Sequence, residues 1–117
     1  NYFLKAAKQR PVSAYAWANM VIMKHHLKQY DKQFFKALET AILLGPWEPF
    51  VQLTVTEVGL INWDRLPPKT QLTVLTMIEQ GMRRQSKSVR TLIEKYQRKD
   101  VVCEYSRQKT VFADFCQ

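Results

Sequence analysis

The sequence is poor in the residues from which most small active sites are built. Its three glycines, Gly45, Gly59 and Gly81, stand far apart, so they cannot form the glycine-rich loop that cradles phosphate groups. It has no serine nucleophile elbow and no H-E-x-x-H zinc motif. It also lacks a run of 18 uncharged apolar residues, and so offers no candidate for a membrane-spanning helix.

Cysteine is scarce as well. Cys103 and Cys116 lie near the C-terminus, with no C-x-x-C motif and no histidine nearby. In an oxidising compartment they would pair across the intervening loop, and in a reducing one they would remain thiols. The sequence leaves both possibilities open.

The other titratable residues do not converge on a site. His25 and His26 are adjacent, so on a helix their side chains point about 100° apart and cannot chelate one metal ion together. Glu48, Glu57 and Asp64 lie near tryptophans, but carboxylates at such positions commonly cap helices and turns. We therefore expect no enzyme, no cofactor and no metal.

What the chain does have is apolar residues and positive charge. Its 117 residues are 46% hydrophobic, enough for one domain of ordinary size. Eighteen Lys and Arg against ten Asp and Glu give a net charge of +8, which favours acidic partners. The start Asn1–Lys5 has neither Met nor a signal-peptide pattern, and we expect the chain to be a piece of a longer protein.

The periodicity is mostly helical. Residues 1–9 are rich in Ala and Lys and stop before Pro11, as a helix does when a proline follows. Ser13 is predicted to cap a second helix that ends before the polar turn at residues 28–30. Asp31 is predicted to cap a third, which ends at Gly45-Pro46.

The segment from Phe50 to Ile61 is ambiguous, because its alternating β-branched residues fit a strand while its valines also fit one face of a helix. We predict a helix. Two further helices are predicted, the last capped by Ser86 or Ser88. Their inward residues are Leu72, Leu75, Ile78 and Met82 in the first, and Val89, Leu92, Ile93 and Tyr96 in the second. Residues 101–117 are expected to be a poorly ordered tail, apart from a packed Phe112 or Phe115.

The run Gly45-Pro46-Trp47-Glu48-Pro49 is predicted to form a rigid elbow between two helices. Gly45 would adopt a positive φ, Pro46 would stop the first helix, and Glu48 would complement the dipole of the second, whose first turn Pro49 presets. Trp47 is predicted to pack across the junction, with an exposed contact residue as the alternative. Trp17 and Trp63 are predicted to pack in the core.

An internal repeat accompanies this pattern. Residues 6–11 and 41–46 match at an offset of 35 residues, close to the 34-residue tetratricopeptide period. Trp17 and Met20 then fall at the aromatic fourth and apolar seventh positions, and Ala41 at the small position of the second helix. Residues 13–46 thus resemble one tetratricopeptide repeat with one inserted residue. The resemblance implies an all-α fold of stacked antiparallel helical hairpins, a short right-handed solenoid, over residues 1–100.

Residues on either side extend this resemblance. Residues 1–11 are similar to the second helix of a preceding repeat, and those from Pro49 onward to the first helix of the next. Three residues depart from the pattern. Val21 and Phe34 stand where small residues are usual, and Lys24 stands where tyrosine is usual.

A narrower resemblance lies between Ala37 and Leu66. Its G-P-W-E-P run at residues 45–49, followed by Val51-Gln52 and by Gly59-Leu60-x-x-Trp63, is similar to a segment of VpsP-type proteins. These are tetratricopeptide-containing bacterial proteins encoded with exopolysaccharide-biosynthesis machinery. The resemblance covers residues 12–98 and implies a helical accessory protein of the bacterial envelope, on its periplasmic face.

The first hypothesis for function is a non-catalytic scaffold that binds a protein partner. In stacked hairpins the first helices line a concave surface. Carrying the repeat phase across the chain predicts that this surface is lined by Tyr15, Ala18, Asn19, Ile22, His25, Phe50, Leu53, Thr54 and Glu57. The identity of the partner and the oligomeric state stay open.

The alternative is a basic helical module that binds nucleic acid. The segment 83–99 holds seven basic residues against one acid, Glu94. Such a run is usually a solvated face, but it also fits nucleic acid, an anionic membrane surface or another acidic polymer. The basic residues are Arg83, Arg84, Lys87, Arg90, Lys95, Arg98 and Lys99.

Overall fold

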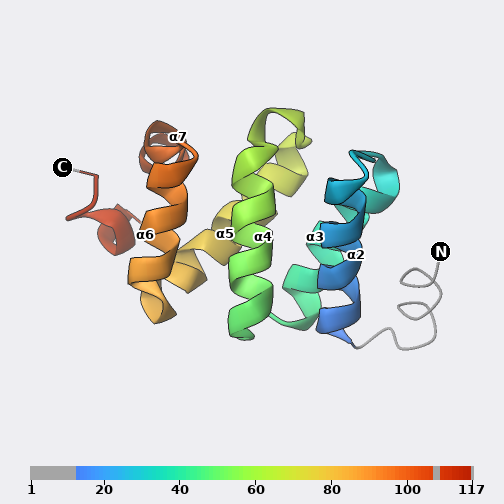
Figure 1. Cartoon of the computed structure of the whole chain (residues 1–117). Helices are drawn as coiled ribbons and strands as arrows, with labels where there is room; N and C mark the ends of the chain where they lie inside the picture. Colours follow the sequence, from blue (N-terminus) through green and yellow to red (C-terminus); the bar gives the residue numbers. More distant parts are fainter. Residues whose placement is uncertain (1–12, 107–108, 117) are drawn as a thin grey trace.

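The computed structural model describes residues 13–106 and 109–116, which form α-helices and short 3₁₀ helices and contain no strand (Figure 1). The elements are α2 (Ala14–His26), α3 (Lys32–Leu44), α4 (Pro49–Ile61), η1 (Trp63–Arg65), α5 (Pro68–Arg84), α6 (Ser86–Lys95), α7 (Lys99–Tyr105) and η2 (Lys109–Phe112). The all-α prediction is confirmed, and the ambiguous segment is the helix α4. The helix predicted over residues 1–9 lies outside the described residues.

Two of the predicted caps are confirmed. The Ser13 hydroxyl accepts a hydrogen bond from the Ala16 N–H at 3.3 Å, and the Asp31 carboxylate accepts one from the Phe34 N–H at 3.0 Å. The Asp31 carboxylate also forms an ion pair with the buried ammonium of Lys24, at 2.8 Å. The hydrogen bond from Lys24 holds the pKa of the Asp31 carboxyl below its usual value. Lys24, one of the three residues that depart from the repeat pattern, therefore links the end of α2 to the start of α3.

The helices stack in two layers (Figure 1). Helices α2, α4 and α6 lie side by side in one layer, with α3 and α5 behind them. Each front helix packs on the helix that follows it and on the next front helix, so α2 contacts α3 and α4, and α4 contacts α5 and α6. The predicted antiparallel packing of α2 on α3 is present. Helices α2 and α4 begin 35 residues apart and end 35 residues apart.

The core lies between the layers. Trp17 and Trp63 are buried in it, as predicted. Leu72, predicted to point inward, is 48% exposed, because α5 turns Val74, Met77 and other residues toward the core instead. The largest fully buried side chains are Phe34, Phe112, Met20, Leu38, Leu60, Met77, Ile78, Ile93, Gln52, Val21, Val51 and Val55.

The elbow differs from its prediction in two respects. Gly45 has a φ of −141°, so the predicted positive φ is wrong. A Cβ on Gly45 would lie 2.5 Å from the Cβ of Ala14, so glycine is required there by the close approach of α2. Trp47 is 55% exposed and does not pack across the junction. Pro49 occupies the first turn of α4, as predicted.

A buried glutamine in α4 holds the elbow to the start of α6. The Gln52 amide donates to the carbonyl of Pro46 at 2.7 Å and accepts from the Gln85 amide at 2.9 Å. The Gln85 amide also donates to the carbonyl of Pro49 at 3.3 Å. We call Gln52 and Gln85 the glutamine clamp. Gln85 is the N-cap residue of α6 and no side chain caps that helix, so the predicted Ser86 or Ser88 cap is wrong.

Order extends beyond residue 100, where a largely unstructured tail was expected. Helix α7 and η2 occupy this part of the chain, and a disulfide joins Cys103 to Cys116. Phe112 and Phe115 are both buried. The apolar residues of the segment therefore pack onto the helical layers, and the disulfide holds the two ends of the segment together.

Two helix ends contain non-glycine residues with positive φ, Lys28 at 56° and Gln97 at 55°. At each end, backbone N–H groups beyond the helix donate hydrogen bonds to carbonyls of its last turns, as in a Schellman motif. For Lys28 the N–H donates to the carbonyl of His25 at 3.0 Å, and the next N–H donates to the carbonyl of Lys24 at 2.8 Å.

Replacing Lys28 by Gly should stabilise the protein by about 1 kcal/mol, because glycine adopts positive φ without the Cβ penalty. Lys28 is exposed, so little else changes. Chemical denaturation would measure the gain. The matched control is Lys32→Gly, which places glycine in the first turn of α3 and should destabilise the protein. A lower stability for the Lys28→Gly variant would contradict the prediction.

Candidate functional site

The front layer carries a groove whose floor is α4. Two adjacent hollows form it, with volumes of about 460 and 390 Å³. The first lies between α4 and α6 and is lined by Phe50, Leu53, Thr54, Glu57, Lys87, Ser88, Thr91 and Leu92. The second lies between α2 and α4 and is lined by Ile22, His25, His26, Phe50, Thr54, Glu57, Val58, Ile61 and Tyr96. Phe50, Thr54 and Glu57 belong to both, so the groove is continuous across three helices.

The structure brings six of the nine predicted surface residues together in this groove. They are Ile22, His25, Phe50, Leu53, Thr54 and Glu57. Tyr15 lies at one end of it, where its ring stacks on Phe50 with centroids 5.7 Å apart. Asn19 is half-buried and lines neither hollow. Ala18 is fully buried, because α4 packs against α2 there, and its predicted place on the surface is wrong.

Sequence reasoning missed the wall that α6 supplies. Lys87, Ser88, Thr91 and Leu92 face α4 across the first hollow. They are spaced by one, three and four positions, so one face of a helix carries all of them. Applying the same helical phase to α6, the third helix of the front layer, would have found them. Its offset is slightly different, since α6 begins 37 residues after α4 and α4 begins 35 residues after α2.

His25 sits in a polar cluster at one end of the groove. Its Nδ1 lies 2.9 Å from the Tyr30 hydroxyl and 3.3 Å from the Asn62 amide nitrogen. Partial burial lowers the pKa of His25, the neighbouring His26 lowers it further, and the Glu57 carboxylate opposes the shift. The lowered pKa favours the neutral imidazole, which acts as a hydrogen-bonding group of the groove wall.

Glu57 joins α4 to the end of α6. Its carboxylate accepts a hydrogen bond from the Tyr96 hydroxyl at 2.6 Å, which raises the pKa of Tyr96. At the other end of the groove the Glu48 carboxylate accepts a hydrogen bond from Tyr15 at 2.7 Å, and this bond raises the pKa of Tyr15. Both carboxylates that border the groove therefore have a tyrosine donor.

The lining of the groove is mixed in chemical character. The groove combines an apolar floor with a few hydroxyl, imidazole and carboxylate groups along its walls, as ligand-binding clefts commonly do. Within the described residues no three His, Cys, Asp or Glu side chains are grouped closely enough to hold a metal ion. None of the described helices combines the length and apolar character needed to cross a bilayer. The chain matches no family model, no curated protein and no solved structure.

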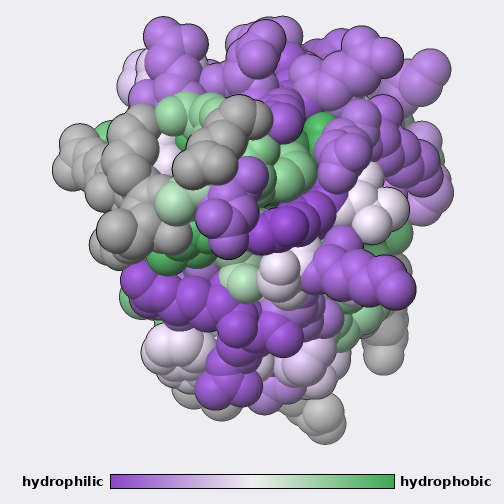
Figure 2. Space-filling view, turned by 90° about the vertical axis from the view of Figure 1, so that its left-hand side faces the viewer, coloured by the Kyte–Doolittle hydropathy of each residue, from purple (hydrophilic) through white to green (hydrophobic). Residues whose placement is uncertain are grey.

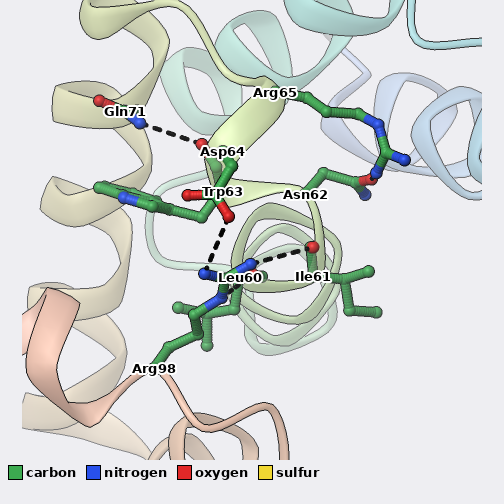
Figure 3. Close-up of polar contacts among 8 residues, drawn as sticks. All are labelled: Leu60, Ile61, Asn62, Trp63, Asp64, Arg65, Gln71 and Arg98. Carbon is green, nitrogen blue, oxygen red and sulfur yellow. Dashed lines mark hydrogen bonds and ion pairs between the residues drawn. The ribbon is translucent and has the colours of Figure 1, made fainter.

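The G-L-x-x-W motif at residues 59–63 has a structural role (Figure 3). Leu60 and Trp63 are buried, and a Cβ on Gly59 would lie 2.7 Å from the Val74 side chain, so α4 and α5 approach closely there. The carbonyl of Trp63 accepts a hydrogen bond from the Gln71 side chain at 3.0 Å, which fixes η1 on α5 (Figure 3).

One member of the predicted basic patch caps a helix. The Arg98 guanidinium donates to the carbonyl of Leu60 at 2.9 Å and to that of Ile61 at 3.4 Å, at the C-terminus of α4 (Figure 3). It also lies 3.4 Å from the Asp64 carboxylate. These bonds satisfy carbonyls that the end of a helix leaves unpaired, so Arg98 is a structural residue.

The other six basic residues occupy two stretches: Arg83, Arg84 and Lys87 lie near the junction of α5 with α6, and Arg90, Lys95 and Lys99 lie further along α6 and at the start of α7. The Arg84 guanidinium lies 5.4 Å from the ring centre of Trp47. Arg90 and Lys99 both lie over the ring of Phe115, at 5.6 and 5.0 Å. Such contacts are cation–π interactions, in which the aromatic face attracts the cation.

The remaining three lie on exposed helical positions. Lys95 is over the Tyr96 ring at 5.2 Å, Lys87 lines the groove, and Arg83 is exposed in the last turn of α5. The end of the molecule formed by α6 and the C-terminal segment is covered mainly by hydrophilic residues (Figure 2). That surface fits the solvated face that such charge runs usually form.

Proposed function

We propose that the chain is a non-catalytic, tetratricopeptide-like scaffold that holds a segment of a protein partner in the groove over α4. The observation that carries the proposal is the convergence of the predicted surface residues. Side chains from α2 and α4, chosen by repeat phase alone, line one continuous groove, and α6 adds the opposite wall. A groove built from successive first helices is the binding surface of helical repeat proteins.

Three features support the tetratricopeptide-like assignment. Helices α2 and α4 begin 35 residues apart, each front helix packs on its own successor and on the next front helix, and α3 packs on α5 in the second layer. In such an array each hairpin contacts only its neighbours, so the core runs continuously between layers. The array of Figure 1 therefore consists of two full hairpins followed by α6 and the shorter α7.

The Cys103–Cys116 disulfide supports a location in an oxidising compartment, because disulfides persist outside the reducing cytosol. Together with the resemblance to VpsP-type proteins, it supports a role as an accessory protein of bacterial exopolysaccharide biosynthesis on the periplasmic side of the envelope. The basic segment adds less support to a nucleic-acid module, since Arg98 caps α4 and four other cations cover aromatic rings.

Peptides selected against the chain from a random display library would test the groove. We expect selected peptides to bind with affinities that change little between low and high salt, because the lining is mainly apolar. Thr91→Arg should weaken binding about tenfold, since Thr91 is exposed on the groove wall and a longer side chain would fill the first hollow.

Thr76→Arg is the matched control. Thr76 is also an exposed helical threonine whose hydroxyl donates to the carbonyl four residues earlier, but it lies on α5, away from the groove. The two variants should have equal melting temperatures. The proposal fails if no peptide is selected, or if Thr76→Arg weakens binding as much as Thr91→Arg.

A further inference from the structure

One edge of the molecule collects exposed apolar residues and positive charge. It is the edge where α2, α4 and α6 begin and where α3 and α5 end, at the bottom of Figure 1. We call it the aromatic-basic edge and define it as residues 13–16, 41–51 and 81–88, all of which the structure describes. It adjoins the groove but extends beyond it, into the elbow and the junction of α5 with α6.

The apolar part of the edge is unusually exposed. Of the seven large hydrophobic side chains that are exposed in the described part of the chain, four lie on this edge. They are Tyr15, Leu43, Trp47 and Phe50. Leu43 is 78% exposed and Trp47 is 55% exposed, and clusters of this kind commonly mark an interaction site.

The charge of the edge is almost entirely positive. Arg83, Arg84 and Lys87 are exposed in the last turn of α5 and the first turn of α6. Glu48 is the one acid within the residues that define the edge, and its carboxylate accepts a hydrogen bond from Tyr15. The cations adjoin the aromatic residues, since Arg84 lies over the Trp47 ring and Lys87 lines the same hollow as Phe50.

The glutamine clamp holds this edge together. Gln52 and Gln85 bond to one another and to the carbonyls of Pro46 and Pro49, on either side of Trp47. The buried amide of Gln52 therefore fixes the elbow against the residue that follows Arg84. The aromatic and basic groups are presented on a backbone that does not need to reorganise when it binds.

We propose that the aromatic-basic edge docks on the surface of an anionic lipid bilayer. Tryptophan and tyrosine favour the level of the lipid headgroups, where their rings are in an apolar setting and their polar groups remain hydrated. Arginine and lysine beside them are attracted to anionic headgroups, by on the order of a fivefold gain in binding per residue. The exposed Leu43 would insert into the same layer.

Nucleic acid fits the same edge less well. Single strands bind where aromatic faces are open for stacking with bases. Here Tyr15 and Phe50 stack on one another at an interplanar angle of 14°, and Arg84 covers a face of Trp47. One face of each ring is therefore occupied, and the hollow that adjoins the edge has Lys87 as the one cation in its lining.

Sedimentation of the chain with vesicles tests the proposal. The probes are vesicles of phosphatidylcholine alone and of phosphatidylcholine mixed with phosphatidylglycerol. We expect binding only to the mixed vesicles, and a loss of at least tenfold for the variant Arg83→Gln/Arg84→Gln. The matched control is Lys32→Gln/Lys36→Gln, which removes the same charge from exposed positions at the start of α3, on the opposite edge.

Trp47 provides a second readout. Trp17 and Trp63 are buried, so a blue shift of tryptophan emission on vesicle binding would report Trp47, and Trp47→Phe should abolish it. The proposal is overturned if the mixed vesicles do not bind the chain, if the control loses as much binding as the edge variant, or if the emission stays unchanged. Binding to a single-stranded oligonucleotide but not to vesicles would assign the edge to nucleic acid instead.

Discussion

Loss of the Cys103–Cys116 disulfide should lower the free energy of unfolding by about 3 kcal/mol, the chain-entropy estimate for a closed loop of this length. The bond closes a segment with a sequence separation of 13 that carries the buried Phe112 and Phe115. Without it the unfolded chain gains freedom, and the two aromatic side chains lose the constraint that holds them against the helical layers. Urea denaturation of the Cys103→Ser/Cys116→Ser variant would measure the change.

The control for this prediction is a dithiol reductant. Added to the unmodified protein, it should reproduce the loss, and added to the double serine variant it should change nothing further. If the variant unfolded at the same urea concentration as the parent, the disulfide would not constrain the fold, and the segment after α7 would be held by its buried aromatic residues alone.

Gly45→Ala should destabilise the protein by about 2 kcal/mol, as overpacking in a close contact does. The added Cβ would lie 2.5 Å from the Cβ of Ala14, closer than two such atoms can approach. Both atoms are attached directly to the backbone, so no change of side-chain rotamer relieves the clash and α2 must move relative to the elbow. Thermal unfolding followed by circular dichroism would measure the loss.

The variant Ala14→Gly/Gly45→Ala separates this contact from other effects. Removing the Cβ of Ala14 leaves space for the new one, so the double variant should recover most of the stability lost in Gly45→Ala. Ala14→Gly alone should cost less than about 1 kcal/mol, because it lies at the first residue of α2. Strictly additive losses would show that the two atoms do not compete for space.

The features predicted correctly from sequence are those that depend on neighbouring residues. Ser13 and Asp31 cap helices because each side chain meets a backbone N–H three positions later. Pro49 lies in a first turn because its own ring sets φ. The end of α3 at Gly45-Pro46 also depends on neighbouring residues. The need for glycine at position 45 does not, because the residue that excludes a side chain there, Ala14, lies 31 residues earlier.

The features that were missed depend on contacts between distant segments. Trp47 meets Arg84, which lies 37 positions later, and nothing in the elbow itself indicates on which side the ring lies. Helical phase placed Phe50, Leu53 and Glu57 on the groove correctly. It failed for Ala18, because phase gives the direction of a side chain on one helix but not how closely the next helix packs over it.

The glutamine clamp also favours the packing of α6 on α4 over a packing of α6 on α2. Gln52 of α4 occupies the position that Trp17 occupies in α2, 35 residues earlier, and both side chains are buried. Were α6 to settle beside α2 of its own chain or of a neighbouring one, the Gln85 N–H that donates to Gln52 would lose its acceptor, because an indole accepts no hydrogen bond. Such exchange between near-equivalent hairpins is a common failure of repeat proteins. The buried amide of Gln52 therefore distinguishes α4 from α2 as a hydrogen-bonding partner for Gln85.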